Sequence, residues 1–244
     1  MTTISVLMCV YEKDEDIPFV QAIDSLIQNK KYIDNTIVII NGPISKLKSS
    51  KINNATKKLK IIKVKLKRNI GISKALNLGL KEVKTDWIAR FDSDDICTKD
   101  RFKTIKNIIR NNKNEYDVIG TYIEEFNLKS NSNIIRKVPL KNNDIKKQLL
   151  FSNPINHVSV FFKSSLIKEF NEKDFYPLID GFEDYALWVK LIFSGKIFKN
   201  IPKVSVFVRA DDKMLNRRGG LKYIKNEIKF RFFIIKYIPI LQIT

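Results

Sequence analysis

The chain has 244 residues, of which 44% are hydrophobic and 29% are charged, and its formal net charge at pH 7 is +19. This length and balance predict one large globular domain, or one domain with an appendage, whose core needs no covalent or metal staples. The two cysteines, Cys9 and Cys97, are too few for a disulfide framework or a zinc site, so we expect reduced structural thiols in a cytosolic protein.

Hydropathy and charge also limit the protein's location and partners. Residues 4–10 are apolar, but the run is short, no basic stretch precedes it and acids follow it, so we expect no signal peptide. No run reaches the ~18–20 apolar residues of a spanning helix, so the protein is not expected to be integral to a membrane. The excess of bases suits a nucleic acid, an anionic membrane surface, or a composition biased toward Lys, Asn and Ile. Since only the C-terminal residues interleave bases with aromatics, we expect no nucleic-acid partner.

Strand-like and helix-like segments alternate in the first part of the chain. The expected strands are residues 4–10, 37–40, 61–66 and 87–91, and the expected helices are residues 17–27, 45–58 and a segment from Gly71 to Val83. This alternation predicts an α/β fold with a mostly parallel central sheet flanked by helices. Ligands of such sheets bind at the carboxyl ends of the strands.

The order of elements changes in the second part of the chain. The expected elements there are a helix at 102–109, strands at 118–123, 134–138, 157–162 and 204–208, and a helix at 182–194 that Gly195 ends. The sequence has no internal repeat and no low-complexity linker. One continuous domain over residues 1–212 is therefore expected.

Residues 213–244 differ in composition from the rest. Arg217 and Arg218 lead into residues 223–237, where Phe and Ile are mixed with Lys and Arg. Such a mixture is typical of a helix that lies in a membrane interface. It also suits a C-terminal helix that packs its apolar side on the domain, and the sequence leaves both alternatives open.

Three acids in four residues, Asp92, Asp94 and Asp95, follow the apolar run that ends at Phe91. Crowded carboxylates repel one another unless a cation neutralises them. In an extended chain Asp92 and Asp94 point the same way. Oxygen ligands favour Mg²⁺ or Mn²⁺, which leave coordination positions for substrate phosphates. The alternative is an acidic turn in which Asp95 caps the next helix.

Three further features are candidates for binding or catalysis. Glu183 and Asp184 begin a predicted helix, where a carboxylate either stabilises the helix dipole or serves as a general base. Arg68 and Lys74 flank a strand-to-helix turn that either favours anions or is a plain joint with solvated bases. His157, the only histidine, is either a structural hydrogen-bonding residue or a binding residue at the cleft edge.

Together and in this order, the motifs resemble glycosyltransferase family 2, which has the glycosyltransferase A fold. Residues 5–11 resemble its first strand and nucleotide-binding loop, 69–79 its Asn-x-Gly and Ala-x-Asn-x-Gly segment, 88–95 its metal motif, and 157–162 and 183–188 its later acceptor-side motifs. The resemblance covers about residues 3–210. With the Arg-Arg-Gly-Gly of the tail, the pattern is most like bacterial enzymes that build capsule and O-antigen repeat units.

The resemblance implies a nucleotide-sugar half over about residues 1–100, an acceptor half over 101–212 and a basic amphipathic helical tail over 213–244. It implies that Asp92 and Asp94 hold Mn²⁺ or Mg²⁺ on the donor diphosphate. Asp184 would deprotonate the acceptor hydroxyl and Glu183 would orient it, with direct displacement and inversion. The implied donor-binding residues are Val10, Tyr11, Glu12, Asn41, Arg68, Asn69, Lys74, Arg90 and Ser93. The other implied site residues, mainly on the acceptor side, are Asp95, His157, Trp188, Arg217 and Arg218.

One position departs from the family pattern. Relatives commonly have an acid where this chain has Asn41, which precedes Gly42 at the end of the second strand. Asn donates as well as accepts hydrogen bonds, so it still suits a pyrimidine edge. The departure weakens the preference for uridine over other nucleotides.

The sequence therefore predicts a metal-dependent inverting glycosyltransferase. The expected reaction moves a hexose (galactose, glucose or an N-acetylated form) from a UDP-sugar to a polyprenyl-diphosphate-linked saccharide. The expected place is the bacterial cytoplasm, on the inner face of the membrane, with the tail on an anionic surface. A non-catalytic sugar-nucleotide-binding module and a nucleotidyltransferase are the alternatives. The intact acids oppose the first, and the lack of a Gly-rich triphosphate loop near the N-terminus opposes the second.

Overall fold

A computed structural model of the protein describes residues 2–112, 115–127, 132–170, 174–210 and 221–236. The strands are β1 Ile4–Val10, β2 Asn35–Asn41, β3 Ile61–Leu66, β4 Trp87–Arg90, β5 Ile96–Cys97, β6 Val118–Asn127, β7 Ser132–Arg136, β8 Phe161–Lys163 and β9 Phe198–Arg209. The helices are α1 Asp16–Gln28, α2 Lys46–Ala55, α3 Ile72–Leu80, α4 Arg101–Asn111, α5 Asn142–Leu149, α6 Ser165–Glu169, α7 Glu183–Phe193 and α9 Leu221–Ile235. Short 3-10 turns lie at Lys30–Tyr32 and His157–Ser159.

The strands form a nine-stranded sheet in the order β3-β2-β1-β4-β8-β6-β9-β5, with β7 paired to β6. The first four strands of this order are parallel, β8 runs antiparallel to both of its neighbours, and β9 is parallel to β6. The register places Val10 opposite Ile40 and Asn41 opposite Leu66. The carboxyl ends of β1, β2 and β3 therefore meet at one edge of the sheet.

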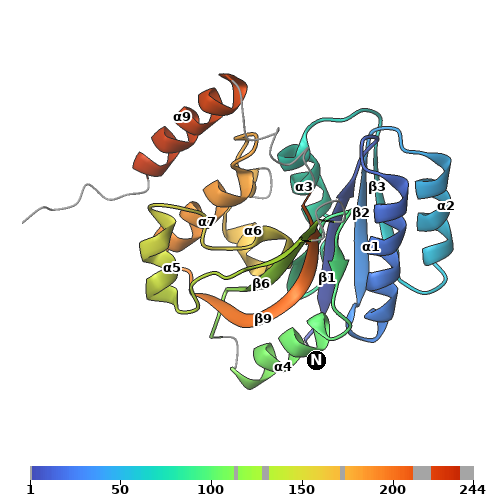
Figure 1. The fold of residues 1–244 in the computed structure, drawn as a ribbon, viewed down its shortest axis with the longest axis horizontal. Helices are drawn as coiled ribbons and strands as arrows, with labels where there is room; N and C mark the ends of the chain where they lie inside the picture. Colours follow the sequence, from blue (N-terminus) through green and yellow to red (C-terminus); the bar gives the residue numbers. More distant parts are fainter. Residues whose placement is uncertain (1, 113–114, 128–131, 171–173, 211–220, 237–244) are drawn as a thin grey trace, which may run out of the picture.

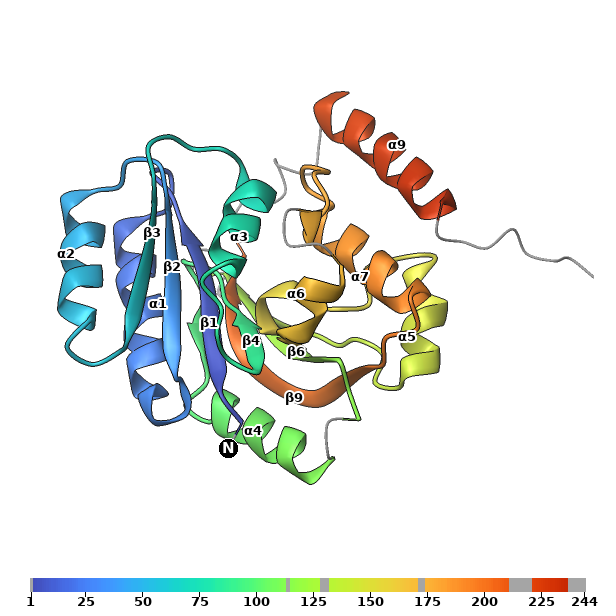
Figure 2. The ribbon, with the colours of Figure 1, turned by 180° about the vertical axis from the view of Figure 1, so that it is seen from behind.

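Helices cover both faces of the sheet (Figures 1 and 2). Successive strand residues point to opposite faces, so Val6 and Met8 pack with α1, α2 and α4, whereas Leu7 and Cys9 pack with α3, α5, α6, α7 and α9. Burial on both faces explains why β1 and β2 are nearly continuous apolar runs rather than alternating ones. Both cysteines are buried and unpaired.

The structure confirms the α/β class and the elements expected up to β4, and it corrects two later ones. Residues 157–162 were expected to form one strand, but His157–Ser159 is a 3-10 turn and β8 begins at Phe161. The last strand begins at Phe198, well before the expected residue 204, and contains Pro202. The register between β6 and β9 shifts beside this proline, because a residue without an N–H fits a bulge better than a regular ladder.

The C-terminal segment packs on the domain. Phe230 and Ile234 of α9 are buried in the same apolar cluster as α7. The boundary expected near residue 213, and with it Arg217 and Arg218, lies outside the described residues. None of the helices in the described part of the chain combines the length and the apolarity needed to cross a bilayer.

Gly79 marks the closest approach of α3 to the sheet. A Cβ built on Gly79 would lie 2.4 Å from Ile39 Cδ1 and 2.9 Å from Leu7 Cδ1. In an exposed helix a Gly-to-Ala change stabilises by about 0.5–1 kcal/mol. Here we expect Gly79→Ala to destabilise by about 1–3 kcal/mol, because the added methyl overpacks the core. Urea unfolding measures the difference, and Lys81→Ala, at the exposed residue directly after the helix, serves as the control. A stabilised Gly79→Ala variant would contradict the close packing.

Candidate functional site

The polar ends of the parallel strands form one edge of the sheet. Asn41, which is 4% exposed, ends β2 and bonds the turn that follows β3. Its Nδ2 donates to Asn69 Oδ1 at 3.1 Å, and its Oδ1 accepts from the Ile70 N–H at 3.0 Å. A Cβ on Gly42 would lie 2.9 Å from the Asn69 nitrogen, so this close approach requires glycine. The Asn41 side chain therefore uses both its donor and its acceptor group in hydrogen bonds within the protein.

The loop after β1 is hydrogen-bonded to α2 and to residues 92–95, which we call the acid motif. Asp14 Oδ2 accepts from the Tyr11 N–H at 3.0 Å and from Ser93 Oγ at 2.7 Å. Burial, followed by the charge of Asp92, raises the pKa of Asp14. The buried Lys48 donates from Nζ to the carbonyl oxygens of Tyr11 and Glu12, at 3.2 and 3.0 Å. These bonds fix the loop over the end of β4.

Arg90, the last residue of β4, is 3% exposed. Its Nη2 lies 2.5 Å from Asp92 Oδ1, and its Nη1 donates to the carbonyl oxygens of Leu7 and Phe91. A buried guanidinium needs such partners, because desolvation of an unpaired charge costs several kcal/mol. The ion pair holds Asp92 at the start of the acid motif.

The rest of the acid motif is held from β9. The Arg209 Nε donates to the carbonyl oxygen of Asp94 at 2.8 Å, and its backbone N–H donates to Asp95 Oδ1 at 3.1 Å. The guanidinium also bonds Gln21 and lies 5.0 Å from the centre of the Phe126 ring. Asp95 therefore faces β9 rather than capping the next helix. Burial, with the charges of Asp92 and Asp94, raises the pKa of Asp95 well above its usual range.

Two acids, Glu183 and Asp184, begin α7, and the charge of Arg90 acts on the first of them. Glu183 Oε2 accepts from the Gly181 N–H at 2.8 Å, and Asp184 Oδ2 accepts from Asn153 Nδ2 at 2.8 Å. Burial, followed by the Asp184 charge, raises the pKa of Glu183 to about 7, while Arg90 lowers it. Burial also raises the pKa of Asp184. Since the charge of Arg90 acts on Glu183 and Arg90 pairs with Asp92, the acid that follows β4 and the first acid of α7 lie near one guanidinium.

A cluster of aromatic rings lies behind these acids. The His157 ring centre is 5.6 Å from Tyr176 and 5.6 Å from Trp188. His157 is partly exposed as a residue, but both of its ring nitrogens are buried and lack a hydrogen-bond partner among the described residues. Burial, followed by the charge of Arg90, lowers the pKa of His157 well below its usual range. The imidazole is therefore neutral at pH 7.

The acid motif fits a hard cation shared with phosphates rather than a cage built by the protein alone. In the parts of the chain that the structure describes, no group of three or more His, Cys, Asp or Glu side chains is placed to hold a metal ion. β4 ends at Arg90 and the chain bends at Ser93 and Asp94, so the extended geometry expected to align Asp92 with Asp94 does not apply. Mg²⁺ is commonly held by only one or two carboxylates plus substrate phosphates. Asp92, with a side chain 42% exposed, and Asp94 suit that arrangement.

Most of the residues expected in the site lie along this edge. Val10 and Asn41 are buried at strand ends, Trp188 is buried in α7, and Glu12, Arg68, Asn69 and Lys74 are exposed on the surrounding loops and the first turn of α3. Sequence reasoning missed Asp14, Lys48, Asn153, Tyr176 and Arg209, which support the site from other elements. Asp14 could have been found from the sequence, since it closely follows the carboxyl end of β1, where ligands of such sheets bind. The others act across large sequence separations that no local pattern shows.

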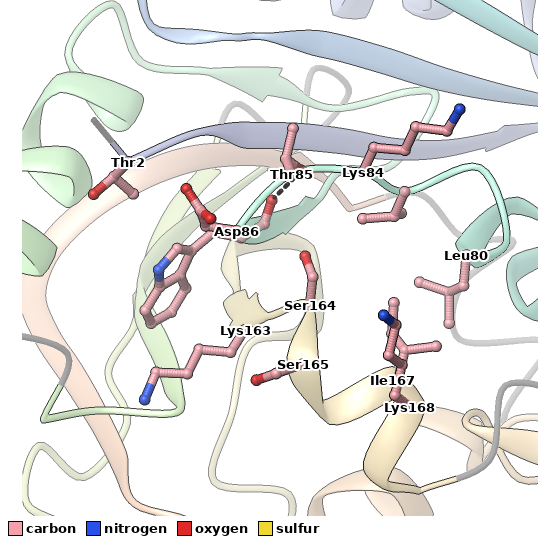
Figure 3. A pocket seen from close by; sticks show the side chains of 12 residues that line it. Thr2, Leu80, Lys84, Thr85, Asp86, Lys163, Ser164, Ser165, Ile167 and Lys168 are labelled. Atoms are coloured by element: carbon pink, nitrogen blue, oxygen red, sulfur yellow. Dashed lines mark hydrogen bonds between the residues drawn. The ribbon is translucent and has the colours of Figure 1, made fainter.

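A cavity lies at the opposite edge of the sheet. It has a volume of about 680 Å³ and is lined by Thr2, the loop before β4 and the start of α6. Figure 3 shows Lys84, Ser164 and Lys168 around it, near the amino ends of β1 and β4. The cavity is thus separate from the acids, which follow the carboxyl end of β4.

Comparisons with known proteins show the family and the fold of this chain. The family model described as Glycosyl transferase family 2 matches residues 5–170. The chain is 34% identical, over 96% of its length and 84% of the relative's, to an Escherichia coli UDP-Gal:alpha-D-GlcNAc-diphosphoundecaprenol beta-1,3-galactosyltransferase. It is 31% identical, over 92% of its length and 83% of the relative's, to the amylovoran biosynthesis glycosyltransferase AmsE of Erwinia amylovora. The S. aureus TarS 1–349 structure with UDP-GlcNAc superposes with a TM-score of 0.73 over 96% of this chain and 67% of that one, at 16% identity.

The raised pKa of Glu183 predicts a pH-dependent stability. A carboxyl whose pKa rises from 4.5 to about 7 on folding binds more protons in the folded chain. Its contribution to the free energy of unfolding therefore falls as pH rises through that window. We expect the melting temperature of Glu183→Gln, relative to wild type, to increase between pH 5 and pH 8. The exposed Glu82→Gln is the control, and a flat difference for Glu183→Gln would refute the shift.

The contacts of Arg209 predict a second effect. Arg209→Ala removes the side-chain bonds to Asp94 and Gln21 and the contact with Phe126, at an expected cost of about 1–3 kcal/mol. Arg209→Lys should recover little, because an ammonium cannot reproduce the guanidinium geometry. Hydrogen exchange of a peptide over residues 91–97 should be faster in both variants than in wild type. Unchanged exchange would show that the loop is held without this side chain.

Proposed function

Since this chain belongs to glycosyl transferase family 2, and is therefore a glycosyltransferase, we propose that it moves a hexose from a UDP-sugar to a saccharide on a polyprenyl diphosphate. The observation that carries the proposal is the arrangement of acids at the carboxyl edge of the sheet: Arg90 pairs with Asp92, and its charge also acts on Glu183, which lies beside Asp184. Ligands of α/β sheets bind at that edge.

Relatives support the choice of donor and acceptor. The Escherichia coli relative is named for UDP-Gal and for an acceptor sugar on diphosphoundecaprenol, and it covers nearly all of this chain. The fold neighbour TarS has been crystallised with UDP and with UDP-GlcNAc. We propose galactose or glucose, or an N-acetylated form, as the transferred sugar. The product would be part of a surface polysaccharide made on the inner face of the bacterial cytoplasmic membrane, at an anionic membrane surface.

The proposed donor site lies between the β1 loop and the acid motif. Asp92 and Asp94 would hold Mn²⁺ or Mg²⁺ with the donor diphosphate. When bound, such an ion acts as a Lewis acid that stabilises the departing diphosphate. Lys48 and Asp14 keep the β1 loop in place, and Arg68 and Lys74 add positive charge at the edge. Asn41 supports the pocket by fixing the turn at Asn69.

The proposed chemical step is a single displacement. Asp184, oriented by Asn153, takes the proton from the acceptor hydroxyl, and that oxygen attacks the anomeric carbon as the bond to the diphosphate breaks. The configuration at the anomeric carbon inverts. Glu183, with a pKa near 7, orients the acceptor hydroxyl beside Asp184. His157 and Trp188 form an uncharged wall on the acceptor side.

A nucleotide-release assay tests the proposal. Purified protein is incubated with a panel of sugar nucleotides and a synthetic sugar-diphosphate-lipid, with Mn²⁺ or with EDTA. We expect UDP release from one donor, lost with EDTA, and a fall in kcat of about 10²–10⁴-fold in Asp184→Asn, as for loss of a general base. The fall in kcat should be smaller in Glu183→Gln. The Asp94→Asn variant should release no UDP at low metal concentration. The exposed Asp144→Asn in α5 is the matched control.

The same assay separates the alternatives. Donor binding without release, across the panel, would favour a non-catalytic sugar-nucleotide-binding module. Release of pyrophosphate instead of UDP would favour a nucleotidyltransferase. Release that persists in EDTA with fully chelated metal would refute the metal-dependent step but not the transfer.

A further inference from the structure

Helix α9 uses one of its faces to pack on the domain. The Phe230 ring stacks 4.9 Å from Phe182 and lies 4.5 Å from Tyr185. Ile234 is buried beside it, and Asn226 Nδ2 donates to the Asp180 carbonyl oxygen at 3.1 Å. Phe182 and Tyr185 lie directly before and after Glu183 and Asp184 in the sequence. The orientation of α9 is therefore fixed relative to the start of α7.

The opposite face of α9 is apolar and exposed. Its large side chains are Ile224, Ile228, Phe232 and Ile235, which are 52%, 52%, 65% and 64% exposed. The spacing of four, four and three residues places them in one stripe along the helix. We call these four residues the outer stripe. Figures 1 and 2 show α9 lying at the periphery, with α7 on its inner side.

Basic residues border the outer stripe. Lys225, Lys229 and Arg231 are exposed on α9, and Lys236 is exposed directly after it. The acid Glu227 is paired with Arg231 at 3.2 Å. A contiguous exposed apolar surface with basic borders marks an interaction site. A second copy of this face would bring the same positive charges together, which disfavours self-association. An anionic bilayer matches both the apolar stripe and its charged borders.

We propose that the outer stripe is the surface through which this protein lies on an anionic lipid bilayer. The stripe inserts among the lipid headgroups while the bordering bases contact anionic phosphates. Because the inner face of α9 packs on Phe182 and Tyr185, the bound protein presents the start of α7 close to the bilayer. This second point rests on the proposed function, since it places Asp184 near the diphosphate of a lipid-linked acceptor.

Vesicle binding by the full chain tests the proposal. The probes are vesicles of phosphatidylglycerol and phosphatidylcholine in equal parts, and vesicles of phosphatidylcholine alone, at low and at high salt. We expect wild type to sediment with the anionic vesicles at low salt. The double variant Ile228→Asp with Phe232→Asp should bind at least tenfold more weakly. The matched control is Ile134→Asp with Phe151→Asp, which adds the same charge away from α9, at apolar residues that are 63% and 82% exposed. Its affinity for anionic vesicles should fall less than twofold.

A second pair of variants separates insertion from charge. Ile228→Asn with Phe232→Asn keeps the net charge, and an equal melting temperature shows that it is folded. This variant should also bind anionic vesicles at least tenfold more weakly. Binding equal to wild type, or wild type that stays in the supernatant with anionic vesicles at low salt, would overturn the proposal. So would a wild-type dimer that the outer-stripe variants convert to a monomer without changing vesicle binding.

The failure of this inference differs from failure of the proposed transfer. With a short-chain, water-soluble acceptor, the outer-stripe variants should retain wild-type UDP release, because the stripe does not contact the acids. With acceptor embedded in anionic vesicles, their release should fall at least tenfold. Equal release in vesicles would overturn the inference while leaving the transferase assignment intact. If wild type binds vesicles but releases no UDP from any donor, the proposed transfer fails while the membrane surface stands.

Discussion

The ion pair between the buried guanidinium of Arg90 and Asp92 organises this protein's site. A guanidinium that is 3% exposed persists only with close acceptors, and it finds them in Asp92 and in the carbonyl oxygens of Leu7 and Phe91. Its charge has further effects. It opposes the rise in the pKa of Glu183 caused by burial, and it helps to keep His157 neutral. One side chain at a strand end thus modifies the effect of burial on the pKa of groups that come from distant parts of the chain.

Parallel register and long-range bonds give the site its rigidity. The parallel strands bring Val10, Asn41 and the acid motif to one edge, and each connecting loop is then bonded to a different element. Lys48 holds the loop after β1, Asn41 holds the turn after β3, and Arg209 holds the acid motif. Sites on loops fixed in this way combine exposure to a substrate with defined geometry. The acids at the start of α7 are the exception, since they depend on Asn153 and on the packing of α7.

The C-terminal helix connects this site to the outside of the molecule. The sequence left two alternatives for the tail, a membrane helix or a packed helix, and α9 has a face suited to each. The inner face is part of the main apolar cluster, so α9 is packed on the domain. The outer stripe lacks such cover within the described residues. An enzyme that meets a lipid-linked acceptor benefits from both, because packing fixes the orientation that a membrane contact then uses.

The sequence by itself determined the alternation of strands and helices up to β4, the position of the acid motif after a buried strand, and the pair of acids that opens α7. Those features are local: apolar periodicity, turn residues and charge clusters are visible within about ten residues. Only the tertiary structure decided the start of β8, the length of β9 around Pro202, and the support that Lys48, Asn153 and Arg209 give to the site. Each of these depends on a partner far along the chain, so single-sequence patterns carry no signal for it. The same holds for Arg90. The sequence predicts that this residue contacts the donor, whereas in the fold its side chain is buried and paired with Asp92.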